Sequence, residues 1–287
     1  MSYKIRDRAI LRQEIEQTHL SREMIAIWSL GQAGMVIKNH QDNIVVIDPY
    51  LSCAIEKNNP ATEFIRRFPP VLEPEDIQYA DAILITHFHD DHLDLNTLLR
   101  VTEKQPRLPI YLPSVDACDI ASRYDLLQQN TFPATTNETF RVGDFTITPI
   151  ASAHSGYERN AQGHDRFLGY FIETCGISFY HSGDTLVTTE LEDELIRRKP
   201  NVMALPINGG DYSRIKRGII PNMSFRDAAD LYHSVKSDFL LPIHYDMFPN
   251  NTDNPTAFVD YMLHHYPGSK FHLTMPGERI IYMRPEV

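Results

Sequence analysis

The stretch Ala82-Ile83-Leu84-Ile85-Thr86-His87-Phe88-His89-Asp90-Asp91-His92 joins an apolar run to a dense group of histidines and aspartates. The apolar run predicts a buried strand, so the polar group begins where a strand passes into a loop. Imidazole nitrogens and carboxylate oxygens are ligands that borderline-soft divalent metal ions accept. A loop at the end of a rigid strand can hold such ligands in fixed positions. The stretch therefore predicts a metal site at a strand end.

Short apolar runs and helical periodicities continue through the rest of the chain, and they favour an α/β (α+β) fold. Because strands come in groups with helices between them, we expect two sheets packed face to face with helices outside. This would be one domain over 1–287, with a helical extension at 1–23 and an irregular insertion at 52–74. Asp90 or Asp91 is expected to cap the helix at 93–101. Strands are expected at 24–30, 35–38, 43–47, 82–86, 110–112, 126–132, 139–141, 145–151, 167–173, 177–181, 202–206 and 239–243; helices at 5–20, 74–80, 93–101, 114–122, 190–198, 224–235 and 256–265; and a final hairpin around 276–277.

The composition is that of an ordinary globular protein, with a formal net charge of −11. This acidic balance disfavours an open surface for nucleic acid, which would carry clustered basic residues. The three cysteines are scattered along the chain, which favours a reduced, cytoplasmic compartment. We expect no membrane segment, because no apolar stretch approaches the roughly 18 residues of a span.

Three more ligand-type residues follow predicted strands: His154, Asp184 and His244. Together with the first cluster they make seven candidate ligands, enough for two ions. A carboxylate that bridges two ions about 3.5–4 Å apart is a common arrangement, and Asp184 is the expected bridge. One ion would take His87, His89 and His154, and the other would take Asp91, His92 and His244.

The His-x-His-x-Asp-His loop, the later single histidine, the Ser-Gly-Asp turn and the late strand-end histidine resemble the metallo-β-lactamase superfamily. Within it, several stretches look like the L-ascorbate-6-phosphate lactonase group: 28–34, 85–94, 180–184, 217–223 and 241–248. The resemblance covers roughly residues 24–255. It implies a four-layer αββα sandwich with the metals at one edge, a hydrolase activity and a possible homo-oligomer.

Other polar residues could support the site or bind substrate. Asp48, at the end of an apolar run, is expected to hydrogen-bond a metal-bound histidine or its backbone, and His181 is expected to be structural or to support the ligands. The loop residues that could contact substrate are Arg166, Asn208, Tyr212 and Arg217. The two arginines could each pair with a phosphate group of the substrate. A solvated charged loop is the alternative for each of them.

The leading functional hypothesis is hydrolysis by a metal-bound hydroxide that Asp91 orients. The resemblance implies a small anionic substrate, a phosphorylated sugar-type lactone such as L-ascorbate 6-phosphate. The same two-metal site would also serve a phosphodiesterase or nuclease, and a non-catalytic metal-binding protein is the third class. The ligand set suits zinc, manganese or iron, and the resemblance favours manganese.

Overall fold

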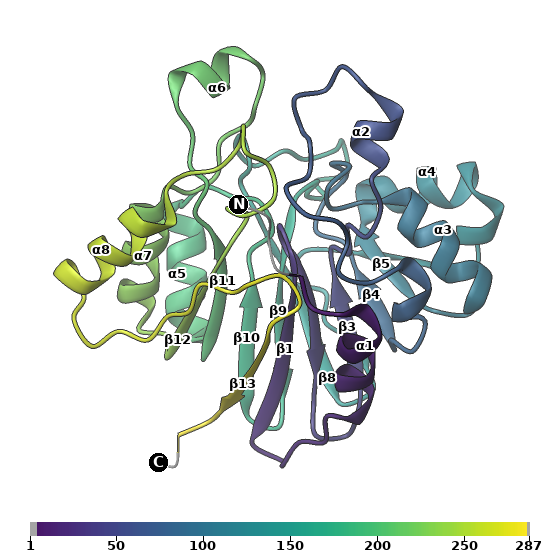
Figure 1. Ribbon diagram of the computed structural model, residues 1–287, viewed down its shortest axis with the longest axis horizontal. Coiled ribbons are helices and arrows are strands. Elements are labelled where there is room, and N and C mark those ends of the chain that lie inside the picture. Colours follow the sequence, from purple (N-terminus) through teal and green to yellow (C-terminus); the bar gives the residue numbers. More distant parts are fainter. Residues whose placement is uncertain (1–4, 286–287) are drawn as a thin grey trace.

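The computed structural model describes residues 5–285 and contains two sheets with helices on their outer faces (Figure 1). The strands of the first sheet are β1 (Met24–Gly31), β2 (Gly34–Lys38), β3 (Ile44–Ile47), β4 (Ala82–Leu84), β5 (Ile110–Pro113), β6 (Thr131–Ala134) and β13 (Arg279–Met283). Those of the second are β7 (Phe140–Val142), β8 (Phe145–Ala151), β9 (Leu168–Thr174), β10 (Ile177–His181), β11 (Val202–Pro206) and β12 (Phe239–Ile243). The helices are α1 (Arg8–Gln17), α2 (Ala54–Asn58), α3 (Leu95–Lys104), α4 (Ser114–Arg123), α5 (Thr189–Arg198), α6 (Tyr212–Lys216), α7 (Phe225–Val235) and α8 (Pro255–His265), with 3-10 turns η1 (Pro74–Ile77) and η2 (Asp125–Leu127).

Each sheet is antiparallel on one side and parallel on the other. The first has the order β13-β1-β2-β3-β4-β5-β6, and pairing is parallel from β3 to β6. The second has the order β12-β11-β10-β9-β8-β7, and pairing is parallel from β10 to β12. Parallel neighbouring strands end at the same edge of a sheet. The loops after β3 and β4 therefore leave one edge of the first sheet, and the loops after β10, β11 and β12 leave one edge of the second.

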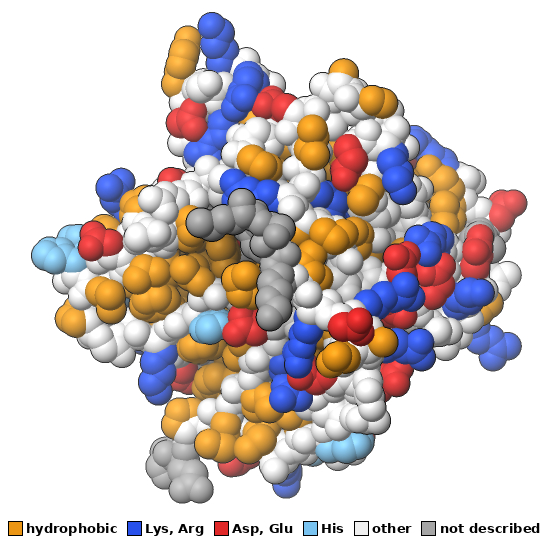
Figure 2. Space-filling view, viewed as in Figure 1, with side chains coloured by type: hydrophobic (Ala, Val, Ile, Leu, Met, Phe, Trp, Pro, Cys, Tyr) orange, Lys and Arg blue, Asp and Glu red, His pale blue; other side chains and the backbone are white. Residues whose placement is uncertain are grey.

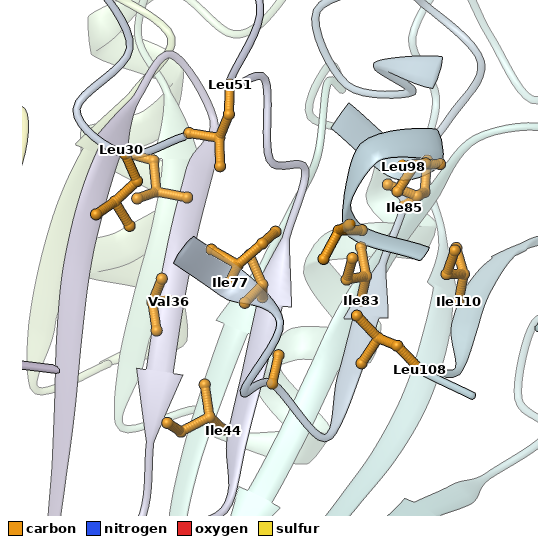
Figure 3. Close-up of a cluster of buried hydrophobic side chains, with 14 of the residues drawn as sticks. Leu30, Val36, Ile44, Leu51, Ile77, Ile83, Ile85, Leu98, Leu108 and Ile110 are labelled. Atoms are coloured by element: carbon orange, nitrogen blue, oxygen red, sulfur yellow. The ribbon is translucent and has the colours of Figure 1, made fainter. Parts of the chain in front are cut away.

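Alternation of side chains along the strands produces the layers. In β3, Val45 and Ile47 belong to the cluster between the sheets, whereas Ile44 and Val46 belong to an outer cluster that includes residues of α1, η1, α3 and α4. Figure 3 shows the outer cluster, in which strand residues such as Ile83 and Ile110 meet Leu98 of α3. The second sheet alternates in the same way, with its outer face against α5, α7 and α8. Both faces of the central strands are therefore covered, and this explains why β2, β3, β4 and β11 are apolar runs rather than alternating ones.

Ile83 offers a direct test of this packing. It is completely buried at the centre of β4, beneath α3. We expect Ile83→Ala to lower the free energy of unfolding by about 2–5 kcal/mol, since it leaves a cavity in a close-packed layer. Ile281→Ala on β13 is the matched control, because that isoleucine is 47% exposed. A urea denaturation series that gave the two variants equal stability would contradict the assigned core.

The predicted two-sheet architecture is confirmed, and several local expectations need correction. The residue whose side chain caps α3 is Asp94, not Asp90 or Asp91, because the chain makes a tight turn through 89–93 before the helix begins. The strand expected at 126–132 is a 3-10 turn followed by β6. The final hairpin does not form: β13 instead pairs with β1 at the edge of the first sheet. The insertion at 52–74 is mostly irregular, but it contains the short helix α2. The expected loop at 208–217 contains α6.

Two segments, around α2 and around α6, project beyond the sheets at the same end of the molecule (Figure 1). Hydrophobic and basic side chains gather on the projection around α6 in the space-filling view (Figure 2). Within residues 5–285, no helix is long and apolar enough to cross a membrane.

Candidate metal centre

The seven predicted ligands come together at one edge of the sandwich. His87 follows β4, His154 follows β8, Asp184 follows β10 and His244 follows β12. They form two groups in which the ligand atoms lie within 4.8 Å of one another. The first group is His87, His89, His154 and Asp184, and the second is Asp91, His92 and His244.

The first group is built from the turn after β4 and the segment after β8. His87 Nε2 lies 2.9 Å from His89 Nδ1. The ring of His154 packs 5.1 Å from that of His89, measured between ring centroids. Phe167 covers these three imidazoles from one side, with its ring 5.2–5.9 Å from each of theirs. The imidazoles are therefore held against an aromatic wall with their nitrogens close together.

The second group faces the first across Asp184. His92 Nε2 lies 3.5 Å from Asp91 Oδ2, and His244 Nε2 lies at the same distance from that oxygen. Asp184 Oδ1 lies 3.4 Å from His92 Nε2, and Asp184 Oδ2 lies 3.2 Å from His244 Nε2 and 3.7 Å from His154 Nε2. Asp184 therefore stands between the two groups, where a bridging carboxylate would stand.

The Ser-Gly-Asp turn places Asp184 there for a steric reason. Gly183 has φ +59°, and a Cβ at this position would lie 2.7 Å from the carbonyl oxygen of Leu168. Only glycine combines the left-handed backbone with such a close approach. The turn thus carries Asp184 away from β10 and into the space between the ligand groups.

The charges and unpaired atoms of this arrangement suit a divalent cation. His92 Nε2, His154 Nδ1 and Asp184 Oδ1 are buried and lack hydrogen-bond partners among the described residues. Within residues 5–285, all ion-pair partners of Asp91 and Asp184 are histidines. Buried carboxylates and unpaired polar atoms are unfavourable unless a counter-charge or partner compensates them. A metal ion would supply both.

The histidines of the two groups differ in their pKa values. Burial lowers the pKa of His154 to about 4 and holds that of His87 well below its ordinary value. Both are then neutral imidazoles, the form that binds a metal. Burial also opposes a charge on His244, but the carboxylates of Asp184 and Asp91 outweigh it and raise its pKa to about 9. The carboxylates beside His244 thus favour a positive charge in this part of the site.

Asp48 supports the site from the end of β3. Its Oδ2 lies 2.7 Å from His92 Nδ1, and it accepts hydrogen bonds from the amide and hydroxyl groups of Thr86. This contact leaves His92 Nε2 directed at Asp184. Asp48 has φ +43° and His244 has φ +62°. Left-handed backbone at non-glycine residues is unfavourable and concentrates at functional sites.

His181 and Gln32 connect the ligands to the first sheet. His181 Nε2 lies 2.8 Å from the carbonyl oxygen of Ala33, and His181 Nδ1 accepts from the amide of Gly183. Gln32 Nε2 donates to Asp91 Oδ2 at 2.7 Å and lies 3.0 Å from His244 Nε2. Gln32 lies in the 28–34 stretch that resembles the lactonase group, but no pattern in the sequence indicated its role in the site.

The four residues expected to contact substrate do not line the pocket above the ligands. Arg166 pairs with Asp116, and Arg217 pairs with Glu63 at 2.6 Å. Tyr212 is 80% exposed at the first position of α6. Asn208 is buried, and it donates to Asn251 Oδ1 at 3.2 Å. Since Asn251 does line the pocket, Asn208 positions a wall residue.

A third group of ligand-type side chains, His40, Asp144 and Cys175, lies at the opposite end of the sandwich. These residues belong to the turns after β2, β7 and β9. The carboxylate of Asp144 is exposed. This group is separate from the metal centre.

The family model described as "Beta-lactamase superfamily domain" matches residues 43–245, well over half of the chain. The chain belongs to this family. The match includes all seven ligand-type residues, and the architecture is that of the metallo-β-lactamase fold, as the resemblance implied. The protein is thus a metal-dependent hydrolase of the metallo-β-lactamase superfamily.

Relatives of this family include named hydrolases. A "UPF0173 metal-dependent hydrolase" of Archaeoglobus fulgidus is 29% identical over 233 residues, which cover 80% of this chain and 87% of that protein. A "Probable L-ascorbate-6-phosphate lactonase UlaG" of Escherichia coli is 23% identical over 274 residues, covering 85% of this chain and 76% of that protein. The solved structure of Igni18, a metallo hydrolase from Ignicoccus hospitalis, superposes with a TM-score of 0.68 at 20% identity, over 91% of this chain and 100% of that one.

Proposed function

We propose that the protein hydrolyses a carboxylic ester bond, most specifically that of a lactone, at a site that holds two divalent ions. His87, His89 and His154 would hold one ion, and Asp91, His92 and His244 would hold the other, with Asp184 between them. The observation that carries the proposal is a single pocket of about 440 Å³ that opens onto both ligand groups. A substrate in this pocket would lie directly above both ions.

When bound, the ions would lower the pKa of a coordinated water towards neutrality and polarise the ester carbonyl. The chain's own residues would orient the reaction. Asp91 lines the pocket, and the hydrogen bond from Gln32 Nε2 fixes its carboxylate. Asp91 is therefore placed to hold the attacking water and to pass its proton to the leaving oxygen. The new bond joins the water oxygen to the carbonyl carbon, and the ring C–O bond breaks.

L-ascorbate 6-phosphate is the lactone that the sequence resemblance and the name of the Escherichia coli relative suggest. Its phosphate group would need a cation, and Arg166 and Arg217 are paired with carboxylates outside the pocket. The pocket therefore supports lactone hydrolysis more strongly than it supports this particular lactone.

A panel of substrates tests the proposal. Protein loaded with Mn²⁺ or Zn²⁺ is assayed on neutral γ-lactones, on L-ascorbate 6-phosphate and on bis-p-nitrophenyl phosphate. We expect kcat/KM for at least one lactone to exceed that for the phosphodiester by about tenfold or more, which corresponds to about 1.4 kcal/mol. A preference for the phosphodiester would instead support the phosphodiesterase alternative.

A further inference from the structure

The pocket above the metal centre has a charged floor and uncharged walls. The floor consists of ligand-type residues and Asp90. Two walls come from the projecting segments around α2 and α6, and a third comes from the segment after β12. The wall residues are Ile55, Asn58, Asn59, Thr62, Phe64, Gly218, Ile219, Ile220, Phe248 and Asn251. Every one of them is apolar, an amide, a hydroxyl or a glycine.

Lysine and arginine are missing from this lining, all of which the structure describes. Asp90 is exposed at the floor and places a further negative charge beside the ligands. An anionic substituent between the walls, away from the ions at the floor, would therefore meet only amides, a hydroxyl, and aliphatic and aromatic groups. Removing such a group from water without a counter-charge is strongly unfavourable.

Three arginines that lie near the wall residues in sequence have other partners. Arg217 precedes Gly218, but its guanidinium pairs with Glu63. Arg214 is buried, and its Nη1 donates to the carbonyl oxygen of Asn208 at 2.7 Å. Arg66 Nη1 donates to the carbonyl oxygens of Tyr50 and Ser52, both at 2.8 Å. Each of these cations supports the walls rather than the pocket.

The apolar part of the walls is continuous with a buried aromatic cluster. Phe248 lines the pocket and packs with Tyr50 and Phe68. Phe64 meets the ring of Phe248 edge to face, with 5.5 Å between the ring centroids. An apolar wall backed by packed rings favours a hydrocarbon substituent, because its burial removes apolar surface from water.

We propose that the natural substrate is an uncharged lactone or ester that carries an apolar substituent, with the reacting bond at the floor and the substituent between the walls. The part of this inference that concerns the reacting bond rests on the proposed function. The part that concerns the substituent rests on the pocket walls. The walls also carry the amides of Asn58 and Asn59, to which a polar but uncharged group of the same substrate could hydrogen-bond.

The test compares γ-nonalactone with its analogue in which a carboxylate replaces the terminal methyl group. We expect metal-loaded protein to favour the neutral lactone by about 10- to 100-fold in kcat/KM, as for a buried group left unpaired. The corresponding pair of γ-lactams, which resist hydrolysis, is measured by calorimetry. The neutral lactam should bind tighter by a similar factor.

Ile220→Lys adds a cation to the pocket wall and should move both preferences towards the carboxylate analogues by about tenfold. Ile215→Lys is the matched control in the same loop, because Ile215 is 54% exposed and lies outside the lining. It should leave both ratios unchanged. Equal or tighter binding of the anionic lactam to the natural sequence would overturn the inference. Tighter binding of the neutral lactam without turnover of any lactone would contradict the proposed function alone.

Discussion

Asp184→Asn is expected to lower kcat/KM by on the order of 10³-fold and to reduce the metal content of the purified protein. The substitution keeps the shape of the side chain but removes the charge of a carboxylate that lies close to histidines of both ligand groups. Asparagine would also direct an amide group at imidazole nitrogens 3.2–3.7 Å away. Metal analysis by mass spectrometry and steady-state kinetics measure the two effects.

Asp193→Asn is the matched control for this variant. Asp193 is exposed on α5, so the same chemical change should leave metal content and activity as they are. If Asp184→Asn retained full activity at full metal content, Asp184 would have no role between the ions. His89→Ala should behave as Asp184→Asn does, because it removes a ligand of the first group. A fully active His89→Ala protein without metal would exclude the site altogether.

Asp48→Asn is expected to weaken metal binding by about 10- to 100-fold while the seven ligand-type residues stay in place. The carboxylate fixes the ring of His92 through Nδ1 and is itself fixed by the amide and hydroxyl groups of Thr86. An asparagine amide would compete with those donors and release the ring. Competition with a fluorescent chelator gives the metal affinity.

Asp81→Asn provides the comparison for Asp48→Asn in the same parallel pair of strands. Asp81 lies at the opposite end of β4, where its carboxylate accepts a hydrogen bond from the amide of Ile44. That substitution should change stability without changing metal affinity. Equal metal affinity of the Asp48→Asn and Asp81→Asn proteins would show that Asp48 does not act through His92.

The ligand-type residues could be predicted because their signal is local. Each follows an apolar run that forms a strand. The strands that precede His154, Asp184 and His244 end at the same edge of the sandwich as β4, which precedes the cluster at 87–92. Asp48 was predictable for the same reason, since it follows β3 beside β4.

The surroundings of Arg166 and Arg217 could not be predicted in that way, because the carboxylates that pair with them are distant in sequence. Arg217 meets Glu63 and Arg166 meets Asp116, and no local pattern indicates either ion pair. Gln32 reaches Asp91 because the turn after β1 lies beside the segment after β12. The amide of His244 in that segment donates to the carbonyl oxygen of Gln32. The prediction of a final hairpin was wrong for a similar reason, because β13 pairs with β1, which is distant in sequence.

Stepwise metal loading tests the central claim most directly. Metal-free protein is titrated with Mn²⁺ or Zn²⁺ while bound metal and lactone hydrolysis are followed in the same samples. Two ions per chain are expected, with hydrolysis rising as the ligand groups fill. Saturation at one ion with full activity, or activity that does not depend on metal, would contradict a two-metal hydrolase.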